Sequence, residues 1–163
     1  ADDRDRGWRA VTETLSKRRL KLWIRLLRTT RLAESELREF LRVEHDSTLP
    51  RFDVMAALHR SDSELTMTEL SRMLLVSNGN ATAVVDRLVK DGLVVRRASE
   101  SDRRIVKVAL TGEGRWQFAE LAAGHEARVD ALFADISSSD LDALDEILHH
   151  IDPRKGITHG LDG

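Results

Sequence analysis

Apolar residues recur at helical spacing along most of the chain, which predicts a mainly helical protein. The first stretch runs over residues 8–44 with no proline or glycine inside it, and its leucines form one broad apolar stripe. A long amphipathic helix is therefore expected there. Residues 45–50 interrupt the pattern, and a shorter helix is expected from Pro50, which suits a first helical turn, to about Ser61, before a polar turn.

Two short helices are predicted in the middle of the chain. Thr66 and Glu69 have the spacing of a capping box, in which each side chain accepts a hydrogen bond from the other residue's backbone N–H group. Ser77 is a second candidate cap only a few residues later, and the helix after it is expected over residues 78–91, ending at Gly92. The apolar side chains of that helix share one inward face: Ala81, Val84, Val85 and Leu88.

A hairpin and two more helices complete the pattern. Residues 93–97 and 105–110 are rich in β-branched or alternating apolar residues, and a polar turn at 99–103 separates them. Helices are expected over 112–135 and over 137–152. The predicted fold class is therefore mainly α with a small β-hairpin wing.

Two short helices joined by a tight turn and followed by a basic hairpin are the layout of a winged helix-turn-helix, here over residues 66–110. In such a unit the second helix enters the major groove of DNA, where base pairs present distinguishable edges. The outward side of helix 78–91 carries small and amide residues, which permit close approach and can pair with adenine. The pattern alone leaves open a plain turn and cap beside a solvated basic edge, because a fold does not dictate a function.

From Leu49 to Gly114 the chain closely resembles the MarR (multiple antibiotic resistance regulator) family. The matching stretches, in this order and spacing, are Thr68–Ser71, Ser77–Asn80, Val85–Val89, Asp91–Val94, Ser101–Arg104 and Val108–Gly114. The resemblance implies a homodimeric repressor in which residues 77–87 read the major groove. It also implies that Asp102 orients Arg103 at the wing tip and that Arg103 probes the minor groove. The residues expected to contact DNA are Thr68, Ser77, Asn78, Gly79, Asn80, Thr82, Asp86, Arg87, Arg97, Asp102, Arg103 and Arg104.

Surplus apolar surface on the terminal helices predicts a homodimer on an inverted-repeat operator, with half-sites about one helical turn apart. A monomer with an intramolecular helical bundle is the alternative. The expected organisation is a disordered N-terminal edge (1–7), an N-terminal dimerisation helix (8–48), the winged unit (49–111), C-terminal dimerisation helices (112–152) and a loose tail (153–163).

Charge is unevenly distributed along the chain. The formal net charge is −2 over 163 residues, yet residues 77–110 carry a net +3 and residues 111–163 a net −7. The predicted DNA-binding segment is thus locally basic, and the acidic end of the chain hides this in the total.

A small-molecule effector is expected, because the family that the chain resembles commonly binds aromatic or anionic molecules between the dimerisation helices and the winged unit. The candidate effector residues are Trp23, Leu27, Arg25, Arg28, Phe52, Met55 and His59. The cations on one face of the first helix, which we name the basic ridge, are Arg18, Lys21, Arg25 and Arg28. The ridge suits a carboxylate or a phosphate, and the resemblance to regulators of aromatic-acid catabolism suggests an aromatic acyl-CoA thioester. Ordinary core packing and a solvated charged face are the alternatives.

Several classes of protein are not expected. Without cysteine there is no disulfide, thiol nucleophile or cysteine–zinc site. No apolar run approaches the roughly 20 residues of a membrane span, so a cytoplasmic protein with no membrane partner is predicted. The histidines show no convincing ligand spacing, and the chain carries no phosphate-binding loop or nucleophile elbow. We therefore expect neither a metal, nor another cofactor, nor an enzyme; a winged protein-interaction module is the alternative function.

Overall fold

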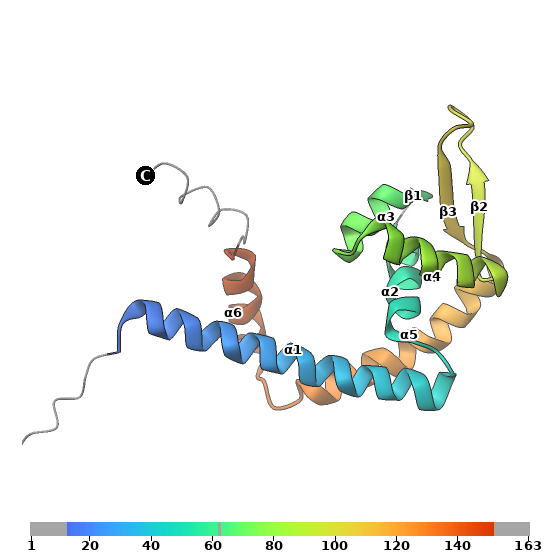
Figure 1. Ribbon diagram of the computed structural model, residues 1–163. Helices are drawn as coiled ribbons and strands as arrows, with labels where there is room; N and C mark the ends of the chain where they lie inside the picture. The colour runs from blue at the N-terminus through green and yellow to red at the C-terminus, as the bar shows by residue number, and fades with distance from the viewer. Residues whose placement is uncertain (1–12, 62, 152–163) are drawn as a thin grey trace, which may run out of the picture.

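The computed structural model describes residues 13–61 and 63–151, a mainly helical chain with a small antiparallel sheet (Figure 1). This confirms the predicted fold class. The edge and tail predicted at 1–7 and 153–163 lie outside the described residues. The elements are α1 (Leu15–His45), α2 (Leu49–Arg60), β1 (Leu65–Thr66), α3 (Met67–Leu74), α4 (Asn78–Lys90), β2 (Val94–Ala98), β3 (Val106–Leu110), α5 (Gly112–Leu132) and α6 (Ser138–His149).

Helix α1 begins later than its apolar pattern predicts. Thr14 is extended (φ −64°, ψ 150°), and its hydroxyl oxygen accepts a hydrogen bond from the backbone N–H of Lys17 at 3.4 Å. Residues 13 and 14, the first that the structure describes, precede the helix. The predicted start at residue 8 is therefore wrong. A threonine side chain that caps the backbone competes with helical continuation, and this local effect determines the boundary.

The local signals in the winged unit are confirmed. Thr66 and Glu69 form both hydrogen bonds of the capping box, and the Ser77 hydroxyl accepts from the backbone N–H of Asn80 at 3.3 Å. Between these helices Leu75 is left-handed (φ 55°) and closes α3, a conformation that costs a side chain energy. Gly92 (φ 75°) ends the turn after α4, as predicted.

The sheet has three strands in the order β1–β3–β2, one more than the predicted hairpin. Strand β1 pairs antiparallel with β3, with Leu65 opposite Val108 and Thr66 opposite Lys107. Only helix α3 was expected to begin at this point. A strand of two residues is too short to show alternation, and Thr66 both pairs in the sheet and caps α3.

The last two helices are shorter than predicted. Helix α5 ends at Leu132 rather than at residue 135, because the backbone N–H of Phe133 bonds to the carbonyls of Val129 and Asp130 and tightens the final turn. Helix α6 is capped by Ser137, as expected, and ends at His149. Neither end carries a glycine or proline that would mark it exactly.

The hydrophobic core lies where the second half of α1 meets α2, α5 and the winged unit. Phe40 and Leu41 of α1 are buried there with Met55 of α2, Leu88 of α4 and Phe118 of α5. The first half of α1 and all of α6 extend away from this core (Figure 1), and α6 has no buried residue. The winged unit therefore lies at one end of the molecule, and the first half of α1 forms an extended arm (Figure 1).

Candidate nucleic-acid interface

Helix α4 presents one face to the core and the opposite face to solvent. Ala81, Val85 and Leu88 are buried, and Val84 is half-buried against the core. This confirms the inward face predicted from the sequence. The outward side carries Gly79, Ala83, Asp86 and Lys90, all exposed, with Thr82 half-buried beside them.

The N-terminal turn of α4 suits contact with an anion. Asn78, Gly79 and Asn80 are exposed, and the first turn contains no acidic residue. The Thr82 hydroxyl donates to the carbonyl oxygen of Asn78 at 2.7 Å, which fixes this turn. Unpaired backbone N–H groups at a helix start attract phosphate.

Two ion pairs hold the acidic side chains of the α4 region. Asp86 Oδ1 lies 2.6 Å from Nη1 of Arg96 on β2, and Asp91 Oδ2 lies 2.7 Å from Nη1 of Arg51 on α2. Asp86, which we expected to contact DNA, is therefore already paired with the wing strand. No sequence signal pointed to either pair, because the partners lie on different elements.

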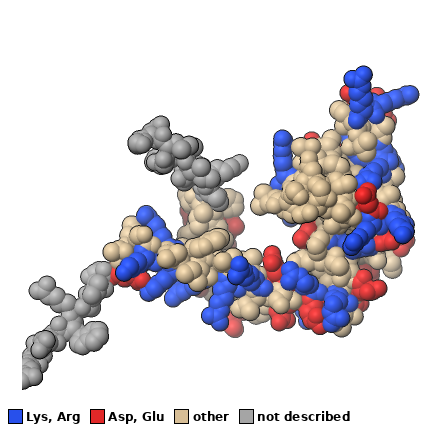
Figure 2. All heavy atoms as spheres, viewed as in Figure 1, with Lys and Arg blue, Asp and Glu red and all other residues tan. Residues whose placement is uncertain are grey.

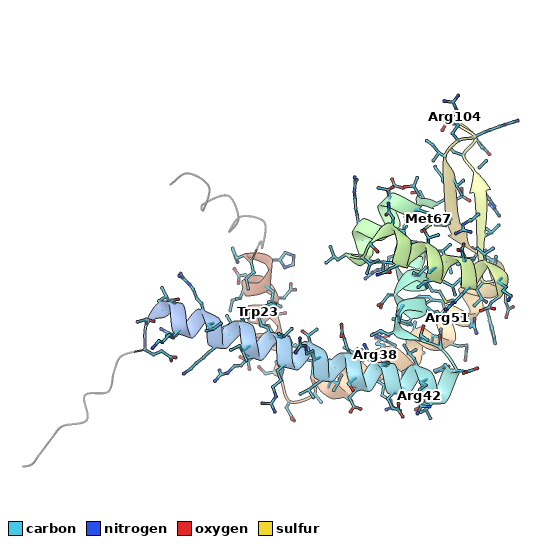
Figure 3. All side chains as sticks on the ribbon, in the orientation of Figure 1. Trp23, Arg38, Arg42, Arg51, Met67 and Arg104 are labelled. Atoms are coloured by element: carbon cyan, nitrogen blue, oxygen red, sulfur yellow. The ribbon has the colours of Figure 1, made fainter. Side chains whose placement is uncertain are left out.

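The wing is the hairpin of β2 and β3, which projects beyond the rest of the molecule with Arg104 at its tip (Figures 1 and 3). Asp102 Oδ1 accepts a hydrogen bond from the backbone N–H of Arg104 at 2.9 Å. Within the described residues, Asp102 makes no hydrogen bond or ion pair with the Arg103 side chain. Asp102 thus shapes the turn backbone, and its role in orienting Arg103 stays a prediction.

The remaining residues that we expected to contact DNA are exposed to solvent. Arg87, Arg103 and Arg104 are exposed, as is Thr68 on α3. Arg97 lies on β2, with its Nη1 3.3 Å from Glu64 Oε1. Basic side chains cluster at the wing tip in the space-filling view, whereas the end of the unit formed by α3 and the start of α4 is mostly uncharged (Figure 2). The winged unit thus offers a neutral helix end and, apart from it, a basic tip (Figures 1 and 2).

The candidate effector residues do not share one cavity within a protomer. Phe52 and Met55 are core residues, 6% and 1% exposed. Trp23 is 57% exposed and lies partway along α1, away from α2 (Figure 3). Leu27 is half-buried, also on α1. In the protomer these residues lie on separate parts of the fold, so an effector pocket that they share stays a prediction.

His59, another candidate effector residue, belongs to an aromatic stack between α2 and α5. Its ring lies 4.7 Å from the Phe118 ring, measured between centroids. The Phe52 ring stacks on His125 at 4.2 Å with an interplanar angle of 16°. Burial lowers the pKa of His125, so the neutral imidazole packs in this stack.

The basic ridge lies along the exposed side of α1. Arg25 and Arg28 are exposed, and Lys21 pairs with Glu13 at 2.7 Å. A shallow cavity lined by Arg18, Lys21 and Arg25 lies over its first part. The cations of the basic ridge are therefore accessible to an anion, although Lys21 is already paired with Glu13.

Neither a metal site nor a membrane-spanning helix is found in residues 13–61 and 63–151. No group of three or more histidine, aspartate and glutamate side chains in that part is placed to hold a metal ion. None of the described helices is both long enough and apolar enough to cross a bilayer.

Comparison with known proteins identifies the fold. The sequence profile of the MarR family matches residues 45–105. A MarR family transcriptional regulator from Silicibacter pomeroyi has a solved structure that matches with a TM-score of 0.69 and 30% identity, over 92% of this chain and 99% of that one. The chain belongs to the MarR family.

The likeness to MarR-family regulators extends beyond the winged unit. MhqR, an HTH-type transcriptional regulator of Bacillus subtilis, is 26% identical over 138 residues, which cover 84% of this chain and 93% of MhqR. A mutant of MarR from E. coli, solved in complex with operator DNA, has a TM-score of 0.74 at 24% identity, over 86% of this chain and 100% of that one. The first comparison supports a transcriptional regulator rather than an enzyme, and the second concerns the fold alone.

Proposed function

We propose that the protein is a transcriptional repressor that binds a pseudo-palindromic operator as a homodimer. The observation that carries the proposal is the exposed, uncharged start of α4, residues 78–80, together with a projecting wing tip that bears Arg103 and Arg104. A helix start without acidic side chains can enter the major groove, and a cationic tip can enter the adjacent minor groove. The complex of E. coli MarR with operator DNA supports the same use of this fold. Repression follows if the occupied operator overlaps a promoter.

The proposed roles differ along the interface. Asn78, Asn80 and Thr82 contact base edges or phosphates from α4, and Arg87 adds a cation at the groove edge. Arg97 and Arg103 belong to the wing, where Arg103 enters the minor groove. Ser77 and Asp102 act through the backbone turns that they cap.

We propose that α1 and α6 form the dimer interface. In this proposal residues 8–48 and 112–152 are the dimerisation segments, and they flank the winged unit at 49–111 in the sequence. Apolar side chains exposed on these two helices in a protomer include Leu20, Trp23, Ile24, Leu144 and Ile147. An exposed surface of this kind marks an interface, and a twofold dimer presents two α4 helices to two half-sites.

Substitution of one wing arginine tests the DNA-binding proposal. Arg103→Ala is expected to weaken operator binding and to reduce the slope of log affinity against log salt by about 1, because one phosphate-region cation is lost. Fluorescence anisotropy with a duplex from upstream of the protein's own gene measures both. Arg42→Ala, at the end of α1 and paired with Glu39 at 2.7 Å, is the matched control. Equal affinities and slopes for the two variants would contradict the wing's role.

A winged protein-interaction module without sequence-specific DNA binding is the second candidate. The turn between α3 and α4 favours this candidate, because Leu75 is 92% exposed there beside the exposed Met73 and Val76. Failure of the unmodified protein to bind any upstream duplex at low salt would favour this candidate, whereas salt-sensitive binding would remove it.

We also propose that a small aromatic or anionic effector, an aromatic acyl-CoA among the candidates, releases the operator and so controls genes of aromatic-compound catabolism. The accessible cations Arg25 and Arg28 of the basic ridge support an anion site, and Leu15 and Leu22 add apolar surface to the cavity beside Arg25. Trp23 and Leu27 face another side of α1 and would line a different part of an effector site. Calorimetric titration with benzoate and benzoyl-CoA tests it. Binding that Arg25→Ala weakens supports the ridge, and no binding of either ligand removes it.

A further inference from the structure

A separate cavity of about 350 Å³ lies between α2 and the N-terminal half of α4. Its walls are mostly apolar: Pro50 and Val54 come from α2, Leu74 from the end of α3, and Ala81 and Val84 from α4. The size falls within the range of cavities that hold small organic ligands, about 300–1,000 Å³. None of the candidate effector residues from the sequence lines it.

Asp53 gives this cavity a single, negative charge. Among the described residues that line the cavity, Asp53 is the ionisable one, and its carboxylate takes part in no hydrogen bond or ion pair with another described residue. Asp53 as a whole is exposed, yet partial burial of its carboxyl raises its pKa, as does the neighbouring Glu34 carboxylate of α1, while Arg60 lowers it. The surroundings therefore disfavour the ionised carboxylate, and a bound cation would stabilise it.

We propose that this cavity binds an organic cation, a molecule with an apolar body and an amine that pairs with Asp53. The apolar walls accept the body, and the ammonium group meets an unpaired carboxylate with a second carboxylate, Glu34, nearby. An anion of the same shape is repelled by both carboxylates. This ligand class is opposite in charge to the one that suits the basic ridge.

The cavity shares residues with the proposed DNA-reading surface. Asn80 lines the cavity and is also expected to contact DNA, and Ala83 lies on the exposed side of α4 while bordering the same space. A ligand in the cavity would contact the side-chain amide of Asn80, which is proposed to bind a base or a phosphate. Ligand and operator then weaken each other's binding by the same factor, because linkage between two sites is reciprocal. This consequence rests on the proposed function, whereas the binding itself does not.

Three probes of one shape test the charge preference on the purified full chain without DNA: 4-phenylbutylamine, 4-phenylbutanol and 4-phenylbutyrate. Isothermal calorimetry is expected to rank the amine about tenfold tighter than the alcohol, and the carboxylate weakest. Equal binding of amine and alcohol, tighter binding of the carboxylate, or no binding of the amine would each overturn the proposal.

Asp53→Asn removes the charge and keeps the shape. It is expected to weaken amine binding about tenfold and to leave alcohol binding unchanged. Glu36→Gln is the matched control, because Glu36 lies two residues from Glu34 and therefore on another side of α1. Removing a carboxylate whose ionised form is disfavoured should not lower the melting temperature at pH 7, so the variant stays folded. Unchanged amine binding by Asp53→Asn would contradict the site.

Operator binding is measured last, with and without saturating amine. A weaker operator complex for the unmodified protein, and a smaller effect for Asp53→Asn, supports the coupling through Asn80. Amine binding that leaves operator affinity unchanged overturns the coupling and keeps the site. Amine binding by a chain that does not bind DNA overturns the proposed function alone.

Discussion

At the scale of the residue, two glycines in the first turn of α5 meet opposite surroundings. A Cβ atom at Gly114 would collide with the backbone carbonyl of Leu93, whereas one at Gly112 would meet nothing within 4 Å. The close approach at Gly114 packs the start of α5 against the turn between α4 and β2. A backbone atom cannot move aside as a flexible side chain does, so the two positions should respond differently to the same added methyl group.

Gly114→Ala is therefore expected to destabilise the protein by about 3 kcal/mol, the upper end for overpacking. Gly112→Ala is expected to stabilise it by roughly 0.5–1 kcal/mol, because alanine loses less backbone entropy in a helix. Urea unfolding followed by circular dichroism, at one protein concentration, measures both. Similar midpoints for the two variants would show that α5 does not start against Leu93 as described.

Residue-level predictions from the sequence succeed where the signal is local. Thr66, Glu69 and Ser77 could be assigned as caps because a cap depends only on a side chain and the next three backbone N–H groups. The partner of Asp102 could not be assigned, since Arg103 and Arg104 stand equally near in sequence and only the turn geometry selects the Arg104 amide. The Asp86–Arg96 pair gave no signal at all.

At the scale of the element, that pair links the recognition helix α4 to the wing strand β2. Asp86 and Arg96 are partly exposed, so their interaction is worth no more than about 1 kcal/mol. In the proposed DNA complex we expect its contribution to be positional, because it would fix the distance between a helix in one groove and a wing in the next. Asp86 would then act without contacting a base.

A double-mutant cycle separates these roles. If the pair positions the wing, then Asp86→Asn, Arg96→Gln and the double variant should weaken operator binding by similar amounts, with a coupling of about 1 kcal/mol. If Asp86 contacts DNA by itself, the two single losses should add. Anisotropy titrations of the four proteins on one operator duplex measure the cycle, and additive losses would reject the positional role.

Elements with many residues are predicted better than short ones. The helical periods of α1 and α4 identify these helices over several turns, so their existence is predictable from the sequence, as is the inward face of α4. The predicted apolar stripe of α1 is instead mostly exposed in the protomer, and α1 buries Leu37, Phe40 and Leu41. Strand β1 has two residues and exists only because β3 lies beside it. The cavity beside Asp53 is equally non-local, since it depends on how closely α2 approaches α4.

At the scale of the whole molecule, the sequence predicts surplus apolar surface but not what covers it. Leu20 and Trp23 of α1 and Ile147 of α6 are each about half exposed in the protomer, at 57%, 57% and 56%. Helix α6 carries acidic residues away from the core, whereas α1 carries the basic ridge, and the basic wing tip lies at the other end of the molecule (Figure 2). This separation keeps negative charge away from the proposed DNA surface.

A charge placed on the outer helices tests whether a second copy covers them. Ile147→Glu is expected to convert a dimer to a monomer, because burying an unpaired carboxylate costs several kcal/mol. Val43→Glu is the control: Val43 is 61% exposed, but it lies near the other end of α1, beside the winged unit. Sedimentation equilibrium measures the mass of each variant. A dimeric Ile147→Glu protein would contradict an interface that includes α6.

Operator binding by the same variants then tests whether the dimer is needed for tight DNA binding. Two linked winged units bind two half-sites with a high effective concentration for the second, so the loss of the dimer should weaken full-operator binding by roughly 100-fold or more. Binding to a single half-site should change little, because each winged unit keeps its own core. Equal losses on half-site and full operator would instead mean that Ile147→Glu had damaged the winged unit, and Val43→Glu guards against a general effect of added negative charge.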